Sequence, residues 1–354
     1  MKRALIIKMS SMGDVIHTLP ALTDVHRLYP DLTFDWVVEP SFAEIPKWHV
    51  AVRNVINAPL RRFRNAPWQT YQAKEWHHLV NQLRYSEYDV VIDAQGLVKS
   101  ALIANFTKGP RYGLNWQSAR EPVSSLGYHH KLGVAKNQHA VERVRELFAQ
   151  VFHYAKPTSA PDYGIDRNKL TNISYGDNTL IFLHGTTWPT KHWPVAYWCE
   201  LALIAAKAGY DVLLPWGSET EKERAHTIKR YCDENGFTNT VLPKLTLGEL
   251  TSLIAKAKGI VAVDTGLGHV AAAMATPTVS VYGPTSPGLT GAYGPNQHHL
   301  AVDAACSPCF GKTCKKGGHF SVMPPCFESL PPIKIWQALV RAMDAAPLTI
   351  MENE

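Results

Sequence analysis

The sequence predicts an α/β protein built from two Rossmann-like, doubly wound domains. Short apolar runs rich in branched residues, typical of buried parallel strands, alternate with segments of helical apolar spacing. Two prolines and small polar residues at 156–162 indicate a linker, after which the pattern begins again with a new strand. A chain of 354 residues is also longer than a domain with a single hydrophobic core usually is. We therefore expect domains at 1–162 and 163–330, followed by a C-terminal helix and tail at 331–354.

The composition is that of a globular protein, and its net charge gives a weak indication of an anionic partner. Apolar residues make up 45% of the chain, and no run approaches the roughly 20 apolar residues of a membrane span. The N-terminus enters a strand without a signal-peptide pattern, so we expect a cytoplasmic protein. The net charge of +6 fits phosphorylated small molecules, an anionic membrane surface or nucleic acid. Aromatic residues do not alternate with a basic stripe, which disfavours nucleic acid.

Two turns in the first half share one design. Ala4–Ile7 is predicted to be a buried strand, and the polar turn Lys8–Asp14 and a helix follow it. Residues 88–94 form a second strong strand, which the turn Gln95–Ser100 and another helix follow. Both turns should therefore lie at the carboxyl edge of the sheet, where open α/β folds bind ligands. Asp14 precedes a helix, so it is either a helix cap or a group that faces the ligand.

The remaining elements of the first half surround a basic stretch. Strands are predicted at 33–38 and 52–56, and helices at 74–84 and from His139 onward. Between them, Arg61, Arg62 and Arg64 surround one aromatic residue without a helical stripe, so we place them on a loop. This loop is either a solvated basic turn or a clamp for phosphate or carboxylate groups, and the clamp is the favoured interpretation.

The first strand of the second half leads into a stretch suited to phosphate. Residues 179–183 form the strand, and Thr186, Thr187 and Lys191 follow it before a helix that begins near Pro194. Hydroxyl groups, backbone amides and an ammonium group are the groups that hold phosphate oxygens.

The sharpest feature of the second half is the strand at 259–263, which ends in Asp264-Thr265-Gly266. A glycine at a helix start lets backbone amides approach a pyrophosphate, and His269 follows one turn later. After the strand at 210–214, Glu221 either stabilises a helix dipole or binds ribose hydroxyls. Residues 278–282 are expected to form the last strand, and 333–345 an amphipathic helix that packs on the first domain.

Several enzyme classes lack their signatures here. No G-x-G-x-x-G follows the first strand of either domain, and no Walker loop or G-x-S-x-G is present. Four of the six cysteines, Cys306, Cys309, Cys314 and Cys326, lie within one loop. Their spacing allows a structural zinc site, but irregular gaps favour a loop staple or free thiols.

Four motifs carry a resemblance to a known family. They are residues 8–22 (KMSSMGDVIHTLPAL), residues 93–100 (DAQGLVKS), residues 191–194 (KHWP) and residues 264–266 (DTG). With these motifs the chain resembles the lipopolysaccharide heptosyltransferases of glycosyltransferase family 9 over nearly its whole length. Within the family, the Ser-Ser-Met-Gly-Asp turn is similar to that of the type I enzymes. The resemblance implies a GT-B fold, in which two Rossmann-like domains face a central cleft.

The family's functional positions carry over to matching residues of this chain. Asp14 matches the general base. The donor-binding positions match Thr186, Thr187, Lys191, Glu221, Leu245 (through its backbone, near adenine), Asp264, Thr265, Gly266 and His269. The acceptor side matches Ser10, Arg61, Arg62, Arg64 and Arg120.

The resemblance implies an inverting transfer of L-glycero-D-manno-heptose from ADP-heptose to Kdo of Kdo2-lipid A. Asp14 would deprotonate the acceptor hydroxyl while Lys191 and the start of the helix after Asp264 stabilise the departing ADP. It implies neither a metal nor a cofactor, and a peripheral place on the cytoplasmic side of the inner membrane. A heptosyltransferase II or III with a heptose acceptor, or a non-catalytic nucleotide-sugar binding protein, remains the alternative.

Overall fold

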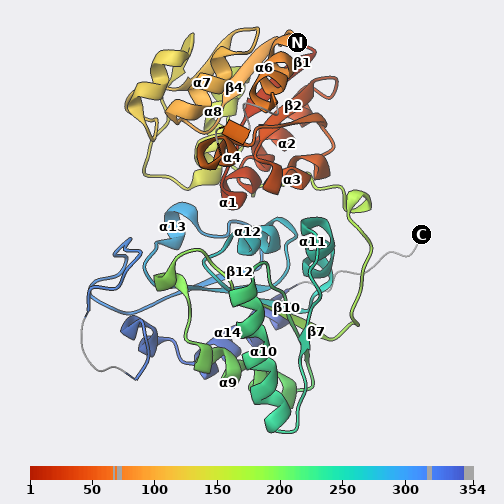
Figure 1. Cartoon of the computed structure of the whole chain (residues 1–354), viewed down its shortest axis with the longest axis vertical. Helices are drawn as coiled ribbons and strands as arrows, with labels where there is room; N and C mark the ends of the chain where they lie inside the picture. The colour runs from red at the N-terminus through yellow and green to blue at the C-terminus, as the bar shows by residue number, and fades with distance from the viewer. Residues whose placement is uncertain (67, 70–73, 317–320, 347–354) are drawn as a thin grey trace. The chain divides into compact units, whose positions relative to one another are not determined.

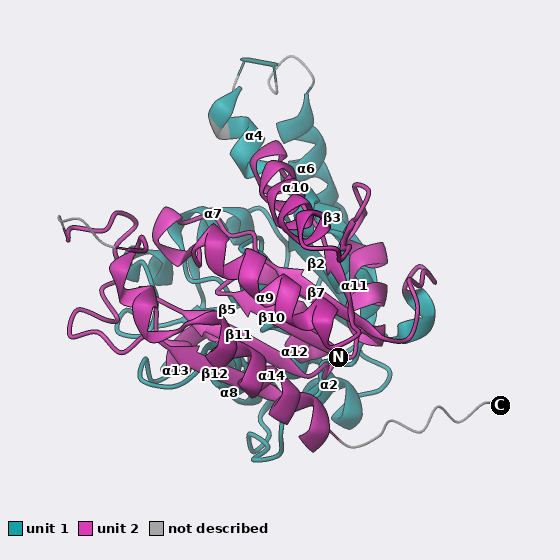
Figure 2. Ribbon diagram, turned by 90° about the horizontal axis from the view of Figure 1, so that it is seen from below, with its two compact units in different colours: residues 1–169 teal, residues 170–354 magenta. Residues whose placement is uncertain are grey.

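A computed structural model describes all residues except 67, 70–73, 317–320 and 347–354. The chain divides into two compact units, Met1–Lys169 and Leu170–Glu354 (Figure 2). The division comes a few residues after the expected boundary at 162, because the segment that follows the linker is still tied to the first unit. Ile165 pairs with His49 in an isolated antiparallel bridge, and the Asp166 N–H donates a hydrogen bond to the carbonyl of Trp48.

The first unit is built on a parallel six-stranded sheet with the order β3-β2-β1-β4-β5-β6. Figure 1 labels three of these strands, β1, β2 and β4. Its strands are β1 Arg3–Ile7, β2 Thr33–Val38, β3 Val52–Asn57, β4 Val90–Asp93, β5 Arg111–Leu114 and β6 His130–Leu132. The strand order reverses between β1 and β4. The carboxyl ends of two strands at such a reversal are where ligands bind in open sheets.

Helices cover this sheet and include one that the sequence pattern did not indicate. They are α1 Met12–Ile16, α2 Leu19–Leu28, η1 Pro40–Phe42, α3 Glu44–Trp48, α4 Leu60–Asn65, α6 Glu75–Tyr85, α7 Val98–Asn105, η2 Pro122–Gly127, α8 Ala140–Phe152 and η3 Arg167–Lys169. The prediction of a loop for the arginine stretch is wrong, because that stretch forms α4. Tertiary packing explains the helix: the Phe63 ring meets the Trp76 ring edge-on at 5.7 Å, and both pack on the core.

The second unit repeats the same strand plan with the order β12-β11-β10-β7-β8-β9, again parallel. Its strands are β7 Thr179–Leu183, β8 Asp211–Leu214, β9 Thr240–Val241, β10 Gly259–Val263, β11 Thr278–Tyr282 and β12 Gln297–Ala301. The expectation that residues 278–282 form the last strand is wrong, because β12 follows. That strand is partly exposed and polar, so no apolar run marks it.

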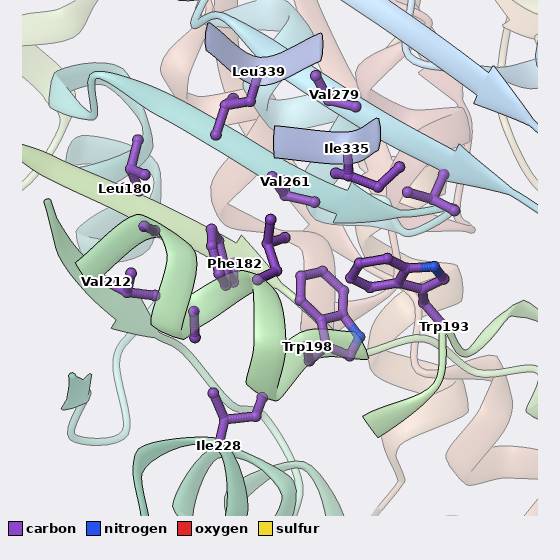
Figure 3. Packing of buried hydrophobic residues seen from close by; sticks show 14 of the residues in the cluster. Leu180, Phe182, Trp193, Trp198, Val212, Ile228, Val261, Val279, Ile335 and Leu339 are labelled. Atoms are coloured by element: carbon purple, nitrogen blue, oxygen red, sulfur yellow. The ribbon is translucent and has the colours of Figure 1, made fainter. Parts of the chain in front are cut away.

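The helices of the second unit bring a further correction. They are η4 Pro189–Lys191, α9 Val195–Lys207, α10 Glu219–Glu234, α11 Leu247–Lys256, α12 Gly266–Ala273, α13 Pro287–Thr290, η5 Pro325–Ser329 and α14 Pro332–Ala345. The prediction that the C-terminal helix packs on the first domain is wrong. Ile335 and Leu339 of α14 lie in the core of the second unit beside Val261 and Val279 (Figure 3). A Cβ at Gly259 would come within 2.8 Å of the Met343 sulfur, so α14 lies closely against β10.

None of the helices formed by the described residues has both the length and the apolar character to cross a bilayer.

Candidate functional site

The opening turn leaves β1 at the strand reversal of the first sheet and leads directly into α1. Ser11 is the N-cap of α1, and Asp14 is the third residue of that helix. The Asp14 Oδ2 accepts hydrogen bonds from the Ser11 backbone N–H at 2.8 Å and from the Ser11 hydroxyl at 2.7 Å. These contacts confirm the capping interpretation. They also fix the direction of a carboxylate whose side chain is 40% exposed.

A buried lysine lies beside this carboxylate. The Lys8 Nζ donates a hydrogen bond to the Ala94 carbonyl at 2.8 Å and lies 4.0 Å from the Asp14 Oδ1. Burial lowers the pKa of Lys8, whereas Asp14 and Asp93 raise it. The Lys8 ammonium therefore depends on the neighbouring carboxylates for its charge.

The turn after β4 lies at the same sheet edge as the opening turn, as the sequence predicts, and the structure shows that it also holds the opening turn in place. The Gln95 Oε1 accepts a hydrogen bond from the Met9 N–H at 2.8 Å, and the Gln95 Nε2 donates to the Ser10 carbonyl at 3.2 Å. Asp93 in turn accepts from the Gln95 and Gly96 amides and from the Tyr128 hydroxyl at 2.6 Å. Burial raises the pKa of Asp93, and these donors oppose that effect.

The predicted acceptor arginines lie on two segments. Arg61 and Arg62 are exposed on α4; the Arg62 guanidinium pairs with Glu75 at 2.9 Å, and that of Arg61 lies over the Phe42 ring at 5.7 Å. Arg64 belongs to the same helix, and its side chain lies outside the description. Arg120 is exposed on another loop and lowers the pKa of Lys8 electrostatically, after the larger effect of burial.

One carboxylate links α4 to the opening turn. The Glu39 N–H donates to the Met9 carbonyl at 3.1 Å, and the Glu39 Oε1 accepts from the Arg61 backbone N–H at 3.2 Å. Through Glu39 the start of the arginine helix is thus joined to the segment that carries Ser10 and Asp14. The first unit therefore brings the carboxylates of Asp14 and Glu39 and several cationic side chains to one edge of its sheet.

In the second unit, two loops meet at the corresponding strand reversal, between β7 and β10. The Lys191 Nζ lies 2.7 Å from the Asp264 Oδ2, and the Thr186 hydroxyl donates to the Asp264 carbonyl at 2.9 Å. The Thr285 hydroxyl donates to the same Asp264 Oδ2 at 2.6 Å. Thr187 is exposed on the same loop. Asp264 is thus the point at which two of the predicted donor residues, Thr186 and Lys191, meet.

The helix that follows Asp264 presents its N-terminus at this point. Thr265 is the N-cap of α12 in extended conformation, and its side chain makes no capping hydrogen bond. Gly266 begins the helix, and His269 is buried within its first turn. An N-terminus without a side-chain cap offers backbone amides and a partial positive charge to an anion.

Glu221 joins the loops that follow β7 and β8. Its Oε2 accepts hydrogen bonds from the Gly217 N–H at 2.7 Å and the Ser218 N–H at 3.2 Å, so it belongs to the capping box of α10. Its place in the first turn of α10 also suits the predicted interaction with the helix dipole. Its other oxygen fills the space beside Gly185, where a Cβ would lie 2.3 Å from Glu221 Oε1. Leu245, partly buried, lies on the loop just before α11.

Comparison with known proteins identifies the family. The family model described as glycosyltransferase family 9 (heptosyltransferase) matches residues 76–319. The chain belongs to this family. Lipopolysaccharide heptosyltransferase 1 of Pseudomonas aeruginosa is 49% identical over 98% of this chain and 99% of its own. The chain is therefore a glycosyltransferase, as the resemblance predicts.

Solved structures of this family confirm the predicted GT-B fold. The Escherichia coli heptosyltransferase WaaC with ADP matches with a TM-score of 0.84 at 42% identity, over 96% of this chain and 99% of that chain. The same enzyme with ADP-2-deoxy-2-fluoro heptose matches with a TM-score of 0.81 at 41% identity, over the same shares of the two chains.

Two polar residues at these sites were missed by the sequence reasoning. Thr285 donates to Asp264, and its position directly after β11 is the signal that could have found it. Arg143 lies one turn into α8; it donates to the Ser118 carbonyl at 2.8 Å, while its buried Nε has no hydrogen-bond partner. Like Arg120, it lowers the pKa of Lys8, so its charge lies near the opening turn. For Arg143, the only signal in the sequence was the predicted start of a helix at His139.

Proposed function

We propose that this family 9 glycosyltransferase transfers L-glycero-D-manno-heptose from ADP-heptose to a Kdo sugar of Kdo2-lipid A, with inversion at the anomeric carbon. Heptose transfer in lipopolysaccharide synthesis is the activity in the names of its relatives, and the WaaC complexes contain ADP or an ADP-heptose analogue. The observation that carries the proposal is the convergence of Thr186 and Lys191 on Asp264, directly before the α12 N-terminus.

The donor binds to the second unit in this proposal. The diphosphate lies at the α12 N-terminus, where the amides around Thr265 and Gly266 and the Lys191 ammonium hold its oxygens. Thr186, Thr187 and His269 add polar contacts. Glu221 binds the ribose, and the backbone of Leu245 binds adenine. When the glycosidic bond to phosphate breaks, negative charge grows on the diphosphate, so a fixed cation and helix amides stabilise the transition state more than the ground state.

Asp14 acts as the general base in this proposal. It takes the proton from a Kdo hydroxyl while that oxygen attacks the anomeric carbon from the face opposite ADP, which inverts the centre. The two hydrogen bonds from Ser11 support this role because they orient the carboxylate before the acceptor arrives. The Lys8 ammonium, 4.0 Å away, balances the charge of the carboxylate.

The acceptor binds along the basic side of the first unit. Kdo carries a carboxylate and lipid A carries phosphates, and guanidinium groups bind both in bidentate geometry. Arg61 and Arg62 are exposed for such contacts, Arg120 is exposed on another loop, and Ser10 lies next to the base. Arg64, also in α4, is assigned to the acceptor by the family resemblance. Because the acceptor is a lipid, we place the enzyme peripherally on the cytoplasmic face of the inner membrane.

The release of ADP from ADP-heptose tests the whole proposal. We expect ADP in the presence of Kdo2-lipid A and none when the acceptor is omitted, with one heptose added to the lipid by mass spectrometry. Release only with an acceptor that already carries heptose would assign the chain to a later step. No release with either acceptor would make it a nucleotide-sugar binding protein.

A further inference from the structure

The loop between β12 and α14 contains four cysteines that the proposed reaction does not use. Cys306, Cys309, Cys314 and Cys326, here called the cysteine cluster, are all free thiols. All four line one cavity of about 490 Å³ in the second unit. Outside η5 (Pro325–Ser329), the described part of this loop forms no helix or strand. A backbone hydrogen bond from the Phe310 N–H to the Pro284 carbonyl ties it to the segment after β11.

All four cysteine side chains line the same cavity, and the electrostatics of Cys326 agrees with that placement. Burial, the largest effect, acts together with Cys306, Cys314 and Cys309 to raise the pKa of the Cys326 thiol to about 11. Such an effect of one thiol on another requires proximity. Four sulfurs that line one cavity are the type of soft donor that structural zinc sites use, and the C-x2-C spacing of Cys306 and Cys309 is common there.

We propose that the cysteine cluster binds one zinc ion in this cavity. As the described residues stand, no group of three or more His, Cys, Asp or Glu side chains is arranged to hold a metal ion. Binding therefore draws the four sulfurs together. The four thiols release four protons, four sulfur–zinc bonds form and nothing is oxidised or reduced. The resulting site carries a net negative charge; Lys316 lines the same cavity, and so do the carboxylates Asp303 and Glu328.

The loop contacts the proposed donor site, which gives the metal a positioning role. The Thr190 hydroxyl donates to the Gly311 carbonyl at 2.6 Å, and the Lys312 Nζ lies 5.4 Å from the centre of the Trp188 ring. The Lys191 Nζ lies 4.6 Å from the same ring. A zinc ion that fixes the loop would thereby fix the segment that carries Lys191; this role rests on the proposed function.

Metal analysis of the full-length protein tests the site itself. Protein purified under reducing conditions should contain about one zinc per chain, and replacement by Co²⁺ should give the absorption of sulfur-bound tetrahedral cobalt. Cys314→Ser and Cys326→Ser should each lose most of the zinc. Cys199→Ala, which changes a buried cysteine outside the cluster, should keep it.

Two results would overturn the site. One is a protein without metal whose four thiols are free, or joined as disulfides, and which takes up neither added zinc nor cobalt. The other is full zinc content in both serine variants. Neither depends on heptose transfer, so the site can fail while the proposed function stands.

The positioning role needs a separate measurement. Removal of zinc with a chelator should weaken ADP binding several-fold, and returning zinc should restore it. Thr190→Val should keep the zinc and still weaken ADP binding, because it breaks the link to Gly311. Equal ADP affinity in all three forms would limit zinc to a structural role in the loop and overturn the positioning role.

Discussion

At the scale of single residues, Asp14 shows how a capping contact and a proposed catalytic role coexist. The sequence left a choice between them. The structure confirms the cap, through the contacts of its Oδ2 with Ser11. A base needs an oriented carboxylate, and the capping box supplies that orientation. The two roles can therefore be separated only by a substitution that keeps one of them.

Asp14→Asn makes that separation. The asparagine side-chain oxygen still accepts from the Ser11 N–H, but it cannot take a proton, so we expect kcat to fall by about 10²- to 10⁴-fold. Thermal stability and ADP binding should stay near wild type. Asp14→Ala should in addition lose about 1 kcal/mol of stability with the cap.

Glu249→Gln is the matched control, because Glu249 forms the same capping box in α11. Turnover close to wild type in Asp14→Asn would exclude Asp14 as the base.

Lys191 is predicted to act on donor and leaving group together. In Lys191→Ala we expect a higher KM for ADP-heptose and a kcat/KM about 10²- to 10³-fold lower, because a fixed charge at the departing diphosphate is lost. Steady-state kinetics with each substrate varied in turn would measure both effects. Lys229→Ala is the control, since this lysine pairs with Asp233 on the surface of α10. A change confined to the acceptor KM would contradict the assignment.

At the scale of elements, the buried strands were the most predictable part. β7, β10 and β11 have the predicted bounds because each is an apolar run enclosed on both faces of a parallel sheet. The short or polar strands β5, β6, β9 and β12 lack that pattern and were missed. α4 was missed for a different reason: contacts between Phe63 and Trp76, distant in sequence, support it.

The candidate site likewise has parts that could be predicted from the sequence and parts that could not. The turns after β1, β4, β7 and β10 could be placed from the sequence, because a polar turn after a buried strand must emerge at the carboxyl edge. Thr285 follows β11 and could have been placed by the same rule, whereas Arg143 could not, since it reaches the opening turn only through tertiary packing.

The helix α4 carries a prediction of its own. Replacing Arg61, Arg62 and Arg64 together by alanine should raise the KM for Kdo2-lipid A about tenfold or more, because charge-assisted hydrogen bonds to the acceptor are lost. The KM for ADP-heptose should not change. Added salt should weaken acceptor binding in the wild type more than in this variant. Arg27→Ala, which breaks a surface pair with Asp162, serves as the control. An unchanged acceptor KM would make the stretch a solvated basic surface.

At the scale of the whole molecule, each unit has a buried histidine that folding keeps neutral. Burial lowers the pKa of His49 in the first unit to about 4, and that of His184 in the second unit to about 3. The His49 Nδ1 accepts from the Ala51 N–H, and its Nε2 lies 3.0 Å from the Thr23 hydroxyl, which suits the neutral ring. At a moderately acidic pH, therefore, these two histidines take up protons in the unfolded chain but stay neutral in the folded units.

The difference between the folded and the unfolded pKa of each histidine predicts how stability depends on pH. Both folded-state pKa values lie below the ordinary value of 6.5, so below that pH the unfolded chain binds more protons and stability falls. From pH 7 to pH 5 we expect a loss of about 2 kcal/mol per histidine, measured by urea unfolding. His49→Gln should lower stability at pH 7 but reduce the further loss at pH 5. An unchanged pH dependence in this variant would show that His49 does not contribute.

The placement of α14 has a consequence for how the polypeptide can be divided. Because this helix stays with the second unit, the backbone passes between the units once, at Lys169–Leu170. A cut at that connection leaves all six strands of each sheet within one fragment. The gene could therefore be split there and its halves expressed as separate polypeptides, which makes this position the natural choice for complementation or segmental isotope labelling.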